Sequence, residues 1–302
     1  SAAEAPNDVA ERLLAARKEQ PADPTKPKSK RRPKAVPTLE DQVTVFIGSG
    51  IEGFSDAAWL KNHRGLSGSR RLKRHRDAAI AEAKELLGKE ALDELLAAGR
   101  YEVVLERAHA VLSKTDLVTK KQLEPLVNAR RSSALALSLR NYLHEVDTDG
   151  AHFDEFLRRL GRSSTGRYTW PLMTALRALV NPEADVCIKP SVFVVQARSM
   201  SPSLAKKLRP TGATYNRYRA MAQELRTRLA GLGLEAADML DVYDFVWATM
   251  RPAAAQSVEA AREARLAATE AETATEAATD APAATDGAPT EPSGTPDEAE
   301  AA

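Results

Sequence analysis

Apolar side chains between residues 38 and 252 recur at intervals of three and four positions, the spacing that places them on one face of an α-helix. Such stripes occur within 39–47, 72–87, 103–112, 135–146 and 153–160. Outside these stripes, short runs rich in β-branched residues occur at 186–188 and 192–195, with Pro190 between them. We therefore expect at most one short strand there, or a helix that begins at Pro190. The periodicity predicts an all-α fold, a single compact domain of roughly ten helices.

Local signals predict where several of these helices begin and end. Thr38 with Asp41 three residues later resembles a capping box, in which each residue bonds to the backbone of the other. Thr169-Trp170-Pro171 predicts a helix start, because proline is favoured in the first turn. Asn181-Pro182 predicts the end of that helix, since the residue before proline disfavours the helical conformation.

The two ends of the chain lack core-forming side chains. Residues 20–37 combine five prolines with six positive charges, and residues 256–302 hold almost no large apolar side chain after Leu266. Such segments bury too little apolar surface to offset the entropy lost on ordering. We therefore predict a flexible basic arm over 1–37, with a possible short helix in 7–19. The helical domain follows over 38–252, and a disordered acidic Ala/Thr/Glu/Pro tail over 253–302.

Composition argues against several protein classes. Cys187 is the single cysteine, so an internal disulfide framework and cysteine-based metal clusters are ruled out. The five histidines show no H-E-x-x-H spacing, which leaves a metal site unsupported. No run approaches 18 apolar residues, and no signal-peptide pattern occurs at the N-terminus. We expect a cytoplasmic protein with no membrane association, no metal and no cofactor.

The net charge of +1 conceals an uneven distribution. Residues 256–302 carry eleven acids against Arg262 and Arg265, a net of −9, so residues 1–255 carry +10. Residues 26–34 hold six positive charges and residues 61–76 hold seven, with no acid in either run. Segregated positive charge favours polyanion partners. The sequence thus predicts phosphate-backbone contacts from Lys28, Lys30, Arg31, Arg32, Lys61, Arg64, Arg70, Arg71, Lys73, Arg74 and Arg76.

Two alternatives accompany this interpretation. The cations of 70–76 could instead pair with acids such as Glu82 or Glu85, one or two turns along a helix. Residues 48–53 also form a G-x-G-x-x-G string. A dinucleotide site needs a strand before that string and an acid about 20 residues later, whereas here the spacing is helical and a basic run follows. A glycine-rich connection between helices is therefore the favoured interpretation of 48–53.

A second set of polar and aromatic residues lies in the last third of the chain. A lysine beside a carboxylate can act as a base or form a Schiff base, and it can equally form a buried ion pair. Asp241 and Asp244 are three residues apart, so a helix would place them on one face. The tryptophans are better interpreted as core anchors than as stacking platforms. The candidate pocket residues are Tyr168, Trp170, Thr174, Lys189, Asp241, Asp244 and Trp247.

Several strings resemble a family of uncharacterised bacterial helical proteins. They are Thr169-Trp170-Pro171-x-x-Thr174, Asn181-Pro182-Glu183, Ile188-Lys189-Pro190-Ser191-Val192 and Leu240 to Trp247 (LDVYDFVW). The resemblance extends over most of 43–250. It implies a bacterial, cytoplasmic protein with a single domain, and it carries no activity or catalytic residue.

These observations lead to a functional hypothesis. We expect a non-enzymatic protein that binds nucleic acid through the basic arm and the 61–76 patch, with its own acidic tail competing for the same surface. The first alternative is an enzyme of unknown reaction, with a pocket near Trp170, Lys189 and Asp244. The second is an adaptor whose domain binds a protein partner.

Overall fold

The computed structural model describes residues 36–65, 75–129, 131–163, 168–206 and 208–279. The chain divides into residues 1–36 and residues 37–302, and all of the described helices belong to the second unit. The described part of this unit consists of helices and connections and contains no strand. The prediction of an all-α fold is confirmed.

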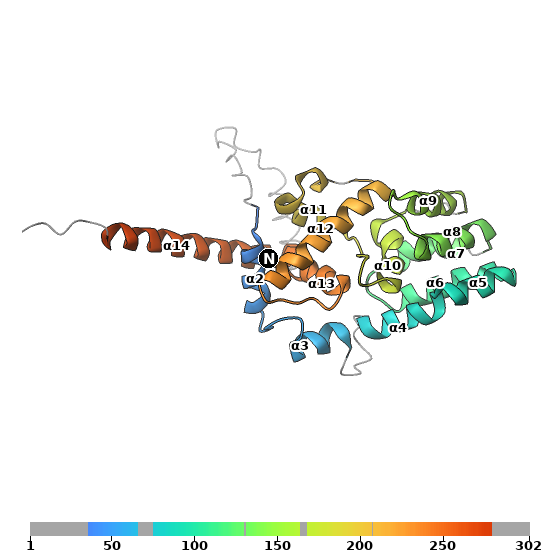
Figure 1. The fold of residues 1–302 in the computed structure, drawn as a ribbon, viewed down its shortest axis with the longest axis horizontal. Helices are drawn as coiled ribbons and strands as arrows, with labels where there is room; N and C mark the ends of the chain where they lie inside the picture. Colours follow the sequence, from blue (N-terminus) through green and yellow to red (C-terminus); the bar gives the residue numbers. More distant parts are fainter. Residues whose placement is uncertain (1–35, 66–74, 130, 164–167, 207, 280–302) are drawn as a thin grey trace, which may run out of the picture. The chain divides into compact units, whose positions relative to one another are not determined.

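The helices are joined by short connections (Figure 1). In the described part, none has the length and apolar content needed to cross a membrane. In chain order the elements are α2 (Leu39–Gly48), α3 (Ala57–Trp59), the π-helix η1 (Leu60–Arg64), α4 (Arg76–Leu87), α5 (Lys89–Ala97), α6 (Tyr101–Ser113), α7 (Lys120–Asn128), α8 (Ser133–His144), α9 (Ala151–Ser163), α10 (Trp170–Val180), α11 (Pro190–Met200), the 3-10 turn η2 (Pro202–Leu204), α12 (Gly212–Gly231), α13 (Met239–Met250), the 3-10 turn η3 (Pro252–Ala254) and α14 (Ala255–Thr279).

Helices α10 and α13 form the centre of the domain. Every residue of α10 is buried, and so are all but two residues of α13. A helix that is apolar on all sides is expected to be enclosed by other elements. Accordingly, α10 packs against α4, α6 and α8, and α13 packs against α2, α11 and α12 (Figure 1). The two central helices also contact each other.

The local signals in the sequence act as predicted. Thr38 and Asp41 form the capping box of α2, with each side chain bonded to the other residue's backbone N–H. Thr169 is the N-cap of α10. Of the two alternatives for the β-branched runs, the structure has the helix that begins at Pro190. No neighbouring strand pairs with 186–188, and the Ile188 N–H donates instead to Thr174 Oγ1, 2.9 Å away.

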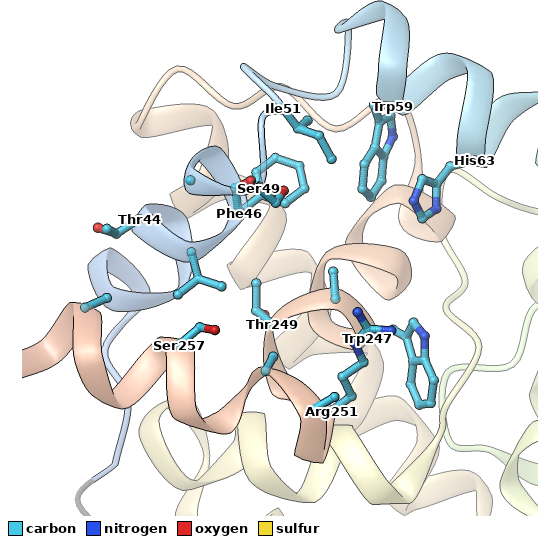
Figure 2. A pocket seen from close by; sticks show the side chains of 16 residues that line it. Thr44, Phe46, Ser49, Ile51, Trp59, His63, Trp247, Thr249, Arg251 and Ser257 are labelled. Atoms are coloured by element: carbon cyan, nitrogen blue, oxygen red, sulfur yellow. Dashed lines mark hydrogen bonds between the residues drawn. The ribbon is translucent and has the colours of Figure 1, made fainter.

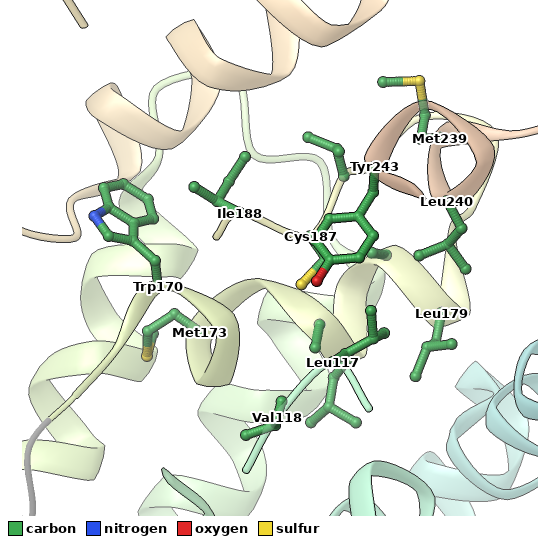
Figure 3. Close-up of a cluster of buried hydrophobic side chains, with 14 of the residues drawn as sticks. Leu117, Val118, Trp170, Met173, Leu179, Cys187, Ile188, Met239, Leu240 and Tyr243 are labelled. Atoms are coloured by element: carbon green, nitrogen blue, oxygen red, sulfur yellow. The ribbon is translucent and has the colours of Figure 1, made fainter. Parts of the chain in front are cut away.

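Around α10 and α13 the core is closely packed (Figure 3). Trp170 is 4% exposed, and its indole Nε1 donates to the Leu208 carbonyl over 2.9 Å. Cys187 is fully buried, and burial raises the pKa of its thiol to about 12. A thiol of this kind stays protonated at neutral pH and is a weak nucleophile. Trp170 is a core anchor, as its position within the apolar stripe indicated.

Helix α14 extends the helical part of the chain to Thr279, beyond the boundary at 252 that composition predicted. The Ala- and Glu-rich sequence of 255–279 has high helix propensity. Two contacts also hold the start of this helix against the domain: Val258 is 3% exposed, and Arg265 Nε donates to Asp41 Oδ1 over 2.9 Å. Residues 280–302, and residues 1–35 of the basic arm predicted over 1–37, lie outside the described residues.

Replacing Trp170 by alanine should lower the free energy of unfolding by about 3–5 kcal/mol, because it removes a buried ring and a satisfied indole donor. Urea denaturation followed by circular dichroism measures this loss. Leu137→Ala on α8 is the matched control, since Leu137 is 52% exposed and its truncation should change stability by less than about 0.5 kcal/mol. Equal effects of the two substitutions would contradict a core role for Trp170.

Candidate functional site

Two buried arginines are paired with aspartates of α13. Arg64, at the end of η1, is 8% exposed. Its guanidinium makes two hydrogen bonds to Asp238, of 3.0 and 2.7 Å, and lies 3.5 Å from Asp241 Oδ1. It also lies 2.7 Å from Asp77 Oδ1. A bidentate guanidinium–carboxylate pair is among the stronger polar contacts in proteins, so Arg64 joins η1 to the start of α13.

Arg76 forms the second pair. It is 1% exposed, and its Nε and one terminal nitrogen bond to the two carboxylate oxygens of Asp244 over 2.9 and 2.8 Å. Its other terminal nitrogen donates to Asp116 Oδ1 over 2.8 Å. Removing a guanidinium from water is costly unless charged partners compensate it. These contacts tie the first residue of α4 to α13 and to the connection after α6.

His63 and Trp59 complete the cluster. Their rings stack with centroids 3.8 Å apart, and Trp59 Nε1 donates to Asp241 Oδ1 over 3.0 Å. His63 is 7% exposed, and its Nδ1 lies 3.4 Å from Asp244 Oδ2 without a hydrogen bond of normal geometry. We call the set of His63, Arg64, Arg76, Asp238, Asp241 and Asp244 the charge cluster.

The local sequence explains why three aspartates at and near the start of α13 contact the two arginines. Asp238 is the N-cap of α13, and its Oδ1 accepts from the N–H groups of Leu240 and Asp241. Asp241 and Asp244 follow at intervals of three, so they lie on the same side of the helix. The expectation that these two share a face is confirmed by their contacts with Arg64 and Arg76.

The environments of Asp241 and Asp244 shift their pKa values in opposite directions. Burial raises the pKa of Asp241, and the charge of Arg64 only partly offsets it. Burial also opposes ionisation of Asp244, but the charge of Arg76 and contacts with His63 prevail and leave its pKa lowered. Asp244 is therefore a stable carboxylate at neutral pH and a poor proton acceptor. The contacts of the charge cluster are ion pairs that join η1 and α4 to α13.

The structure divides the predicted nucleic-acid residues into three groups. The side chains of Arg64 and Arg76 are buried in ion pairs with aspartate. The prediction that they contact phosphate is therefore wrong for these two residues. Lys61 on η1 is exposed. The other members lie outside the described residues: Lys28, Lys30, Arg31, Arg32, Arg70, Arg71, Lys73 and Arg74.

The predicted pocket residues do not line one common cavity. Trp170 and Thr174 belong to the core, and half-buried Tyr168 packs against it. Asp241 and Asp244 belong to the charge cluster. The Lys189 ammonium lies 3.7 Å from the centroid of the Trp247 ring. Within the described part of the chain, no group of three or more His, Cys, Asp and Glu side chains could hold a metal ion.

Sequence reasoning missed a cavity of about 510 Å³ between α2, α13 and α14 (Figure 2). Phe46, Trp59, His63 and Trp247 contribute to its wall. Of the predicted pocket residues, Trp247 lines it. The available signal was the excess of aromatic residues in 46–63, but the sequence does not show that these residues face the end of α13, nearly 190 positions later.

Comparisons of the chain with protein-family models, with curated proteins and with solved structures found no match. The chain's own residues therefore carry the functional argument.

Asp244→Asn should lower the free energy of unfolding at pH 7 by about 3–5 kcal/mol, because it leaves the buried Arg76 without its main countercharge. The difference in free energy of unfolding between wild type and Asp244→Asn should become smaller below about pH 4. Below that pH the unfolded wild-type chain takes up a proton at Asp244, whereas the folded chain, in which the pKa of Asp244 is lowered, keeps the carboxylate ionised. Stability from the pair is thus lost as the pH falls. Urea denaturation at pH 7 and pH 3 measures both effects.

The control for this prediction is Glu224→Gln, which removes one partner of the exposed i,i+4 pair with Arg228 on α12. Its effect should be no more than about 0.5 kcal/mol at either pH. A difference between wild type and Asp244→Asn that stays constant from pH 7 to pH 3 would contradict the lowered pKa.

Proposed function

We propose that this protein binds the phosphate backbone of nucleic acids without catalysing a reaction. The proposed contacts come from the basic run 26–34 and from the segment that starts at Lys61 and continues through 66–74. The residues assigned to this role are Lys28, Lys30, Arg31, Arg32, Lys61, Arg70, Arg71, Lys73 and Arg74. The observation that carries the proposal is that Arg64 and Arg76, on either side of 66–74, are both held in place by buried aspartates.

Arg64 and Arg76 bracket the segment 66–74, and both are fixed to α13 by buried aspartates. The residues at the two ends of the segment also touch. A Cβ on Gly65, whose φ is +89°, would lie 2.6 Å from His75 Nδ1. Both ends of 66–74 are thus attached at one place on a rigid part of the domain. Such anchoring supports an interaction segment, because loops that bind are commonly held by a rigid scaffold.

The charge balance gives further support. Arg70, Arg71, Lys73 and Arg74 add four positive charges to 66–74, and the segment contains no acid. Exposed Lys61 adds another positive charge one helical turn before its start. Neutralising phosphates releases condensed counterions, which favours binding of any nucleic acid sequence. This arrangement fits backbone contact better than recognition of bases.

A structural role for the same cations is the competing explanation. The two arginines of the charge cluster face five aspartates: Asp77, Asp116, Asp238, Asp241 and Asp244. The cations of 66–74 would then serve to neutralise the excess negative charge. In that case their removal would destabilise the domain and leave nucleic-acid affinity unchanged.

Replacing Arg70, Arg71, Lys73 and Arg74 together by glutamine should weaken binding to a fluorescein-labelled duplex, about equally for unrelated sequences. The slope of log affinity against log salt should become shallower by about 0.9 for each lost duplex contact. Fluorescence anisotropy over a salt series measures both quantities. Loss of stability in urea without any change in affinity would overturn the proposal and favour the competing explanation.

The matched control changes the same number of charges elsewhere. It replaces four exposed residues by glutamine: Lys84, Arg100, Lys120 and Lys121. If net charge alone governed binding, this variant would lose as much affinity as the first. The proposal requires the loss to be specific to 70–74.

We further propose that the acidic tail competes with nucleic acid for the basic segments. Residues 280–302 contain six acids and no basic residue, and a tethered segment acts at a high effective concentration. A chain that ends at Thr279 keeps α14 and should bind the duplex more tightly at low salt, with a difference that shrinks as salt screens both contacts. Anisotropy again measures the two affinities. Equal affinities at low salt would remove the tail from the proposal.

A further inference from the structure

The cavity between α2, α13 and α14 has the size of a small-molecule site. Its volume of about 510 Å³ falls within the roughly 300–1,000 Å³ typical of ligand pockets in proteins. Figure 2 shows Trp59 and His63 side by side at one end of the cavity, with Trp247 and Arg251 at another. This site is separate from the residues assigned to phosphate contact.

One side of the cavity is aromatic and rigid. Trp59 is fully buried, stacks on His63 and packs edge-on against Phe46 at a centroid distance of 5.2 Å. The Trp59 indole is fixed by its hydrogen bond to Asp241. Phe46 is 2% exposed, so these two rings form the buried backing of the wall, and half-buried Trp247 supplies its accessible aromatic surface. An accessible aromatic surface favours contact with a planar ring.

The lining contains one arginine and no acidic residue. Arg251, at the C-cap of α13, is exposed, and none of its contacts with the described residues is an ion pair. His63 is the other ionisable residue of the lining, and no Asp or Glu belongs to it. A guanidinium without a carboxylate partner is suited to bind an anion through charge-assisted hydrogen bonds.

Three of the four hydroxyl groups of the lining contribute less to selectivity. Thr44, Ser49 and Thr249 already donate to backbone carbonyls of their own helices, over 2.9, 2.6 and 2.9 Å. Their donors are therefore occupied without a ligand. The choice of ligand charge is left to Arg251 and His63.

Helix α14 closes one side of the cavity with small side chains. Ser257 and Ala261 of α14 line it together with Ala254 of η3, and buried Val258 holds the start of α14 to the domain. The bond between Arg265 and Asp41 adds a second attachment to α2. Larger residues at these positions would fill the space, so the small side chains of α14 preserve the cavity.

We propose that this cavity binds a small aromatic molecule that carries one negative charge, such as an aromatic carboxylate or sulfonate. The ring packs against the accessible part of Trp247, and the anionic group pairs with Arg251. His63 provides a polar contact beside the ring.

The test uses the full chain and two fluorescent probes with the same ring system. 1-Anilinonaphthalene-8-sulfonate carries a negative charge, and N-phenyl-1-naphthylamine is neutral. The anionic probe should bind with a stoichiometry of one per chain. Arg251→Gln should weaken this binding about tenfold, the expected effect of losing a hydrogen bond to a charged group. The neutral probe should bind the wild type and this variant with equal affinity.

Two further variants locate the binding. Ala261→Phe should reduce the affinity for both probes, because the added ring occupies the cavity. Arg228→Gln removes one positive charge from an exposed position of α12 and should leave both affinities unchanged. Near-ultraviolet circular dichroism of each variant confirms native packing, since the anionic probe also binds partly folded states.

Three results would overturn the proposal. The first is the absence of saturable binding of the anionic probe to the natively packed chain. The second is an equal loss of affinity for both probes in Arg251→Gln, which would remove the selection for an anion. The third is unchanged binding to a natively packed Ala261→Phe variant, which would place the probe elsewhere.

Discussion

The bidentate pairs of Arg64 with Asp238 and of Arg76 with Asp244 are the contacts on which the organisation of this domain depends. Each joins residues about 170 positions apart in the chain. A buried guanidinium is tolerated only when carboxylates and hydrogen bonds replace its hydration. Arg64 and Arg76 must therefore lie beside the aspartates of α13. This requirement fixes η1 and the start of α4 against α13.

Both proposed sites depend on this arrangement. The charge cluster attaches the two ends of 66–74 at one place, which supports a role for that segment in phosphate contact. It also fixes Trp59 through Asp241 and places His63 beside Asp244, and these two rings form part of the cavity wall. A single set of buried ion pairs thus positions the residues at both ends of 66–74 and one side of the small-molecule site.

Charge counting finds the basic run of 61–76, but it does not distinguish the members of that run. In sequence, Arg64 and Arg76 look like Arg70 or Arg74, because each is a cation in a stretch without acids. The burial of Arg64 and Arg76 depends on the aspartates packed against them, and these aspartates come from α13 and from the connection after α6. The same limit applies to Lys189, whose neighbour proves to be the Trp247 ring.

The sequence by itself determined the helical class, the capping box of α2, and the helix that begins near Pro171, while at Pro190 it left a strand and a helix as alternatives. These features depend on hydrogen bonds and side-chain spacings within a few residues, so they can be identified from residues that are close together in the sequence. The tertiary structure alone decided which arginines are buried, which aspartates face them, and that Phe46, Trp59 and Trp247 enclose a cavity. Those outcomes depend on packing between helices far apart in the chain, where burial sets the cost of an unpaired charge.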